Sequence, residues 1–166
     1  MMLRSLCVAA ALSLTACGFT PVHAPNLGVE DGVKFKDIRV QLVRAEDISE
    51  DEGSYWLQQS LYDRLGTSGS KHTLEITPRF QRVGYGTSSS DVETRFDMNA
   101  NVSYRLIDIA TGDVLDRGTV RSTSTFGAPR DLYGRTATQK NATQNVARDV
   151  ADRLLVRVAA YYANAS

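Results

Sequence analysis

Residues 92–106 alternate between apolar and polar side chains along their whole length, and this segment constrains the fold most strongly. Because successive side chains of a β-strand point to opposite faces, the alternation predicts one long strand with an apolar face and a polar face. At about 3.3 Å per residue the strand would span roughly 50 Å, so strong twist or a bulge is expected. The rest of the chain must cover the apolar face, and the polar face must meet water or a polar partner. The polar side chains are Glu93, Arg95, Asp97, Asn99, Asn101, Ser103 and Arg105.

Three other segments carry the pattern of a strand. Residues 34–43 alternate clearly, and residues 114–126 alternate more weakly. In residues 71–85 the apolar side chains change parity, which predicts a bulge near residues 81–82. Pro78 in the same segment cannot donate a ladder hydrogen bond, so it indicates a sheet edge or an irregular site.

Two segments predict helices. Ser49 and Glu52 have the spacing of a capping box, and leucines then recur at helical spacing, which predicts a helix over residues 49–65. Gly66 follows where a left-handed residue commonly ends a helix. A long apolar stripe predicts a second helix over residues 136–163.

The order of these segments, β-α-β-β-β-α, predicts the α+β class. We expect a two-layer sandwich in which a four-stranded mixed sheet carries both helices on one face. The last three strands would form an antiparallel meander, and the first would join in parallel through a right-handed crossover. A single domain is expected over residues 34–166, after a proline- and glycine-containing tether at residues 17–33.

The first residues have the parts of a secretory signal peptide. Arg4 gives a positive start, residues 6–14 form a short apolar run, and small residues precede Cys17. The apolar run is shorter than the about 20 residues that a membrane-spanning helix needs. A cytosolic protein with a slightly apolar N-terminus is the alternative interpretation.

The sequence Leu-Thr-Ala-Cys at residues 14–17 resembles the bacterial lipobox, in which cleavage occurs before a cysteine that carries lipid. We therefore expect residues 1–16 to be removed and Cys17 to be lipidated, with palmitate among its acyl groups. In such lipoproteins an aspartate after the cysteine favours retention in the inner membrane. Gly18 stands there instead, so we expect an anchor on the periplasmic side of the outer membrane.

The charged and polar residues favour a binding or assembly protein over an enzyme. The 19 basic and 19 acidic side chains cancel, which gives no support for nucleic-acid binding. His23 and His72 fall in different segments, and the sequence holds no CxxC, HExxH or phosphate-binding loop. We therefore predict no catalytic residues, no metal site and no cofactor.

Three motifs resemble the LptE family, lipoproteins of the outer-membrane machinery for lipopolysaccharide (LPS). Residues 17–21, Cys-Gly-Phe-Thr-Pro, resemble the mature N-terminus of that family. Residues 93–98, Glu-Thr-Arg-Phe-Asp-Met, resemble the entry to its third strand. Residues 126–129, Phe-Gly-Ala-Pro, followed by Arg135, resemble the loop before its last helix. With the predicted order of elements, the resemblance extends over nearly the whole mature chain.

The resemblance implies both a partner and a ligand. LptE proteins lie as a plug inside LptD, a large outer-membrane β-barrel, where they help the barrel to fold and take part in LPS delivery. Arg135, and secondarily Arg130, would contact LPS phosphates, because a guanidinium binds phosphate in bidentate fashion. A solvated surface charge is the alternative for either residue. The candidates for facing the polar interior of the barrel are Glu93, Arg95, Asp97, Asn99, Asn101 and Arg105.

Other interpretations remain open. Relatives often have a basic residue at the tip between the second and third strands, whereas residues 86–91 contain none. An auxiliary periplasmic lipoprotein of an ABC-type lipid transporter would also be a mixed α/β protein. An anchored cell-wall enzyme is a third class, which the missing catalytic residues disfavour.

Overall fold

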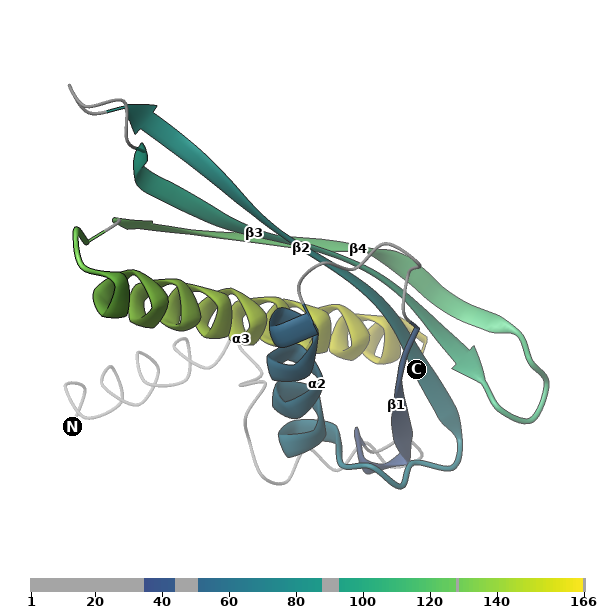
Figure 1. Cartoon of the computed structure of the whole chain (residues 1–166). Helices are drawn as coiled ribbons and strands as arrows, with labels where there is room; N and C mark the ends of the chain where they lie inside the picture. The colour runs from purple at the N-terminus through teal and green to yellow at the C-terminus, as the bar shows by residue number, and fades with distance from the viewer. Residues whose placement is uncertain (1–34, 44–50, 88–92, 128, 166) are drawn as a thin grey trace, which may run out of the picture. The chain divides into compact units, whose positions relative to one another are not determined.

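The strands and helices follow one another in the predicted order, which confirms the α+β class (Figure 1). The computed structural model describes residues 35–43, 51–87, 93–127 and 129–165, all within the unit Asp31–Ser166. The predicted signal peptide, lipidation site and tether lie outside the described residues. The elements are η2 (Phe35–Asp37), β1 (Ile38–Leu42), α2 (Asp51–Leu65), β2 (His72–Thr87), β3 (Glu93–Asp108), β4 (Val114–Gly127) and α3 (Leu132–Ala165).

The sheet has the order β1-β2-β3-β4 and is mixed, as predicted. β1 pairs in parallel with β2, because the chain crosses over through α2 before it returns to the sheet. β2, β3 and β4 form the antiparallel meander. Pairing between β2 and β3 extends from His72 opposite Asp108 to Tyr85 opposite Arg95 and beyond, so the long strand is paired along nearly its whole length.

β1 covers only one end of β2, where its five residues pair with residues 72–76. A hydrogen bond of 2.8 Å from Val43 N to Ile76 O shows that the backbone of Ile76 faces this edge. Because the backbone groups of a strand alternate with a period of two, the nitrogen of Pro78 faces the same edge, beyond the end of β1. Pro78 thus occupies the sheet edge that the sequence indicated.

The bulge predicted near residues 81–82 is wrong. The β2–β3 register passes through this region without a shift. Val83 and Tyr85 consequently lie on the face opposite the core, and both stay partly exposed. Unbroken ladder hydrogen bonds with β3 outweigh the burial of two apolar side chains at this end of the sheet. A register shift occurs instead between Leu106 and Ile107 in the β3–β4 pair.

Both helices lie on the same side of the sheet and cover its apolar face (Figure 1). The apolar parity of the long strand faces this core over residues 98–106, as predicted, whereas Phe96 is only half-buried. Within the described part of the chain, no helix combines the length and the apolar character needed to cross a membrane. The buried core includes Leu57, Leu61 and Leu65 of α2, Met98, Val102 and Leu106 of β3, and Val146, Val150, Leu154 and Val158 of α3.

α2 packs closely on β2 at Gly53. A Cβ atom built there would lie 2.5 Å from Cγ of Phe80, whose side chain is itself only 7% exposed. The glycine therefore lets the helix approach the ring. At the other end of α2, Gly66 has a φ of 80° and donates its N–H to Tyr62 O at 2.9 Å, as its predicted capping role requires. Ser49 of the predicted capping box lies outside the described residues.

α3 begins at Leu132, earlier than the predicted residue 136. The carboxylate of Asp131 accepts a hydrogen bond of 2.6 Å from Gly134 N, and its carbonyl accepts one of 3.2 Å from Arg135 N. This N-cap satisfies free amides of the first turn and offsets the low helix propensity of Gly134. Arg135 therefore lies in the first turn of α3 and not, as predicted, in the loop before it.

Candidate functional site

No described helix covers the second face of the three long strands, which is here called the open face. Alternation along each strand and the register between strands place a continuous set of polar side chains on it. Its polar residues are Glu75, Thr77, Arg79 and Gln81 of β2, Arg95, Asp97, Asn99, Asn101, Ser103 and Arg105 of β3, and Arg117, Thr119, Arg121, Thr123 and Thr125 of β4. Towards its two ends the open face also carries Val83 and Tyr85, and Ile107 and Val114.

The sequence pattern predicts the polar face of β3 but not the polar side chains that β2 and β4 add to it. Glu93 starts β3, but its side chain lies outside the described residues. The residues contributed by β2 and β4 could not be assigned, because single-sequence alternation does not reveal which strands pair or in which register. The other predicted barrel-facing residues all lie on the open face: Arg95, Asp97, Asn99, Asn101 and Arg105.

Cross-strand hydrogen bonds hold the polar side chains of the open face in place. The hydroxyl of Thr125 donates to Asp97 Oδ1 at 2.6 Å, and a parallel bond of 2.7 Å runs from Thr123 to Asn99 Oδ1. Glu75 and Arg105 form an ion pair of 3.5 Å between β2 and β3. The open face is thus a polar surface on a paired sheet, with part of its side chains already ordered.

On the helix side, a cluster of four residues joins the far end of the sheet to α3. The rings of Phe96 and Phe126 stack with centroids 5.6 Å apart, and the Arg82 guanidinium lies 5.2 Å from the Phe96 centroid. Arg82 also donates to Gln139 Oε1 at 2.9 Å. Stacking and the cation–π contact together compensate for the incomplete burial of both rings. This arrangement fixes the position of the first half of α3 against the sheet.

The start of α3 presents apolar and cationic side chains together. Leu132 is 74% exposed and Tyr133 is 85% exposed. Arg130, just before the helix, and Arg135, in its first turn, are exposed beside them in the chain. This set of four residues is here called the α3-start surface. The sequence pattern predicts a loop here, so it indicates the two arginines but gives no sign of Leu132 and Tyr133 as part of the surface.

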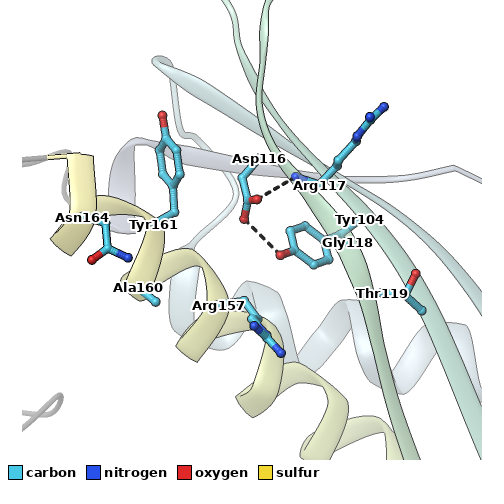
Figure 2. Close-up of a pocket in the computed structure, with 9 residues that line it drawn as sticks. All are labelled: Tyr104, Asp116, Arg117, Gly118, Thr119, Arg157, Ala160, Tyr161 and Asn164. Carbon is cyan, nitrogen blue, oxygen red and sulfur yellow. Dashed lines mark hydrogen bonds between the residues drawn. The ribbon is translucent and has the colours of Figure 1, made fainter.

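A groove of about 440 Å³ lies between β4 and the C-terminal part of α3 (Figure 2). Tyr104 donates its hydroxyl to Asp116 Oδ2 at 3.0 Å, and its ring approaches Gly118, where a Cβ would come within 3.0 Å. Burial, and then the hydrogen bond to Asp116, raise the pKa of Tyr104. Because these two groups bind each other, the polar side chains that α3 leaves for a ligand are Arg157, Tyr161 and Asn164. Nothing in the sequence pattern pointed to this groove.

A buried histidine joins the C-terminal turn of α3 to the sheet. His72 Nδ1 lies 3.2 Å from the Tyr162 hydroxyl, and its Nε2 lies 3.7 Å from Asp108 Oδ2. Burial lowers the pKa of His72, although the carboxylate of Asp108 opposes this effect. His23 lies outside the described residues, and no group of three or more metal-ligating side chains gathers in the part of the chain that the structure describes.

Comparison with known proteins places the chain among structures with one fold. No protein-family model and no curated protein matches its sequence. A candidate lipoprotein from Caulobacter crescentus CB15 matches at a TM-score of 0.65 and 22% identity, over 80% of this chain and 94% of that one. The chain therefore has the α+β fold seen in solved bacterial lipoproteins.

Two further structures with this fold come from other bacteria. The rare lipoprotein B of Shewanella oneidensis matches at a TM-score of 0.53 and 10% identity, over 76% of this chain and 97% of that one. A minor lipoprotein of Acinetobacter baumannii matches at a TM-score of 0.53 and 15% identity, over 77% of this chain and 93% of that one. At these identities the similarity is one of fold.

Proposed function

We propose that this chain is an outer-membrane lipoprotein of the LptE type. It would plug and help to assemble an LptD-like β-barrel and assist the transport and insertion of LPS at the cell surface. The signal and lipobox pattern support the anchor at Cys17, and the fold is one found in bacterial lipoproteins. No catalytic role is assigned to any residue in this proposal.

The open face is the observation that carries the proposal. Three long paired strands leave a polar face that no described helix covers, with Asn, Ser, Thr and Arg side chains in register. The interior of an outer-membrane barrel is polar, so a plug must offer it a hydrophilic and shape-stable surface. A sheet face whose hydroxyls and amides bond across strands meets that requirement, because little further ordering is needed on docking.

The α3-start surface supports the role in LPS transport. LPS is an amphiphile with phosphate groups and acyl chains. Arg130 and Arg135 offer guanidinium groups for phosphate, and the exposed Leu132 and Tyr133 offer apolar contact area. A surface for a purely polar ligand would not need two large exposed apolar side chains beside its cations.

Co-purification from the native membrane tests the proposal. The tagged, lipidated chain is expected to bring down a large outer-membrane β-barrel. Asn101→Trp, at the centre of the open face, should reduce this recovery, whereas Thr111→Trp in the exposed turn between β3 and β4 should not. Equal melting temperatures of both variants would show that folding is intact.

Other outcomes contradict the proposal. Recovery of an inner-membrane ATPase complex would favour the auxiliary lipoprotein of a lipid transporter. Recovery of a barrel that Asn101→Trp leaves unchanged would retain the barrel partner but remove the open face as its docking surface.

A further inference from the structure

The open face is positively charged, although the chain as a whole has no net charge. Its described side chains include two carboxylates, Glu75 and Asp97. The compensating acidic residues lie elsewhere, including on the two helices. The arginines of the open face are Arg79, Arg95, Arg105, Arg117 and Arg121.

Some arginines of the described chain have an acidic partner and others do not. On the helix side, Arg64 pairs with Asp152 at 2.6 Å and Arg153 pairs with Asp149 at 2.8 Å. On the open face, Arg105 pairs with Glu75. No ion pair between described residues involves the arginines at positions 79, 117 and 121. The open face therefore holds cations that no acidic side chain of the described ranges neutralises.

The register places like charges next to one another. Arg105 of β3 lies directly opposite Arg117 of β4, and Arg79 and Arg121 flank Asn101 in a row across three strands. Like charges directly opposite on neighbouring strands destabilise a sheet. A partner that supplies anions at this place would remove the repulsion, so the arrangement favours the bound state over the free one.

The residue type and the surroundings indicate which anion fits. Each cation of the open face is an arginine, whose planar guanidinium binds a carboxylate or a phosphate in bidentate fashion. Beside Arg105 and Arg117 the open face offers mostly hydroxyls and amides. The apolar side chains described there are Ile107, which is half-buried, and Val114, which is 42% exposed; both are aliphatic and short, a small contact area for an acyl chain. The α3-start surface has such groups at Leu132 and Tyr133. A protein surface therefore fits the open face better than an LPS molecule does.

We propose that the open face docks on a carboxylate-rich protein surface. The residues that bind its carboxylates are Arg79, Arg105, Arg117 and Arg121. The inference rests on the proposed function for the identity of that protein, which would be the wall of the barrel. The chemistry assigned to it, rows of Asp and Glu side chains opposite rows of arginine, stands on the register and charge of the open face alone.

Site-directed photo-crosslinking in cells tests the inference. A benzophenone amino acid replaces Ser103, which is exposed and lies between the two arginine rows, in the full lipidated chain. Arg105→Gln with Arg117→Gln should lower the crosslink yield about tenfold. The matched control, Lys140→Gln with Arg148→Gln on exposed positions of α3, removes the same charge and should leave the yield unchanged.

Sequencing the crosslinked peptide separates this inference from the proposed function. A segment in which Asp and Glu outnumber Lys and Arg supports the inference, whichever protein contains it, and contradicts the proposed function if that protein is not a barrel. A barrel segment without that excess overturns the inference and leaves the proposed function intact. A crosslink to LPS, no crosslink, or an undiminished yield in the variant with both open-face substitutions also overturns it.

Discussion

The substitution Gly53→Ala tests the packing of α2, because close packing and helix propensity predict opposite changes in the free energy of unfolding. In an exposed helix, Gly→Ala is expected to stabilise by up to about 1 kcal/mol. At Gly53 the new Cβ would lie 2.5, 2.6 and 2.7 Å from Cγ, Cδ2 and Cδ1 of Phe80. These atoms are at the root of a ring that is 7% exposed, so the ring cannot swing away and the helix must shift.

The magnitude follows from the size of that shift. Ordinary contact between the Cβ and the ring begins near 3.4 Å, so α2 must move by roughly 1 Å. Overpacking of this kind costs about 1–3 kcal/mol, and the propensity gain offsets part of it. We expect Gly53→Ala to lower the free energy of unfolding by about 1–2 kcal/mol.

Urea unfolding of the purified, non-lipidated protein measures the effect, with an unchanged m-value as evidence that the transition is comparable. Gly127→Ala is the matched control, because its Cβ would meet nothing within 4 Å and should leave stability unchanged or slightly higher. A Gly53→Ala protein as stable as wild type, or more stable, would refute the close packing of α2 on Phe80.

Four further predictions concern Phe96 at the edge of the core, the buried His72, the predicted lipidation of Cys17 and the predicted LPS contact of Arg135. Phe96→Ala should lower the free energy of unfolding by about 2 kcal/mol, because the ring is half-buried and a fully buried Phe would lose about 3–5 kcal/mol. Met98→Ala, at a fully buried position, should lower it by about 2–5 kcal/mol, and denaturant midpoints compare the two variants. The lowered pKa of His72 means that its stabilising contribution is present above the ordinary value of 6.5 and lost as pH falls below it; thermal melts between pH 5 and 7 should show this loss, and His72→Gln should flatten it. Cys17→Ala should abolish acylation, and mass spectrometry that finds unmodified Cys17 in the wild type would contradict the lipoprotein assignment. Arg135→Asp should stabilise the first turn of α3 by about 0.3–1 kcal/mol yet weaken LPS binding, and equal LPS affinity of mutant and wild type would reduce Arg135 to a surface charge.

The sequence predicted most of the fold because its strongest patterns are burial patterns. The alternation of β3 and the stripe of α3 are imposed by the core, so the buried parity of residues 98–106 could be predicted directly. The prediction of a bulge near residues 81–82 is wrong because it too relies on burial, and burial does not decide the register there. At that end of the sheet ladder hydrogen bonds decide the register, and Val83 and Tyr85 stay on the outer face.

The candidate site was harder to predict, because it depends on which strands pair. Arg95 and Arg105 could be placed on a polar face from β3 alone. That Arg117 lies opposite Arg105 follows from the β3–β4 register, which a single sequence does not show. The predicted start of α3 is too late, because Gly134 lowers the helix propensity of this stretch while the hydrogen bonds of the Asp131 cap, which offset it, are visible only in the structure.

The short reach of β1 has a consequence for the behaviour of many such molecules at high concentration. Past residue 76, no described strand pairs with β2 on the side of β1, and unpaired edges invite strand pairing between neighbouring copies. Pro78 faces that edge with no N–H to offer, so an intermolecular ladder would lose a bond soon after it began. Pro78 is therefore expected to protect crowded copies of the chain from edge-to-edge aggregation along β2.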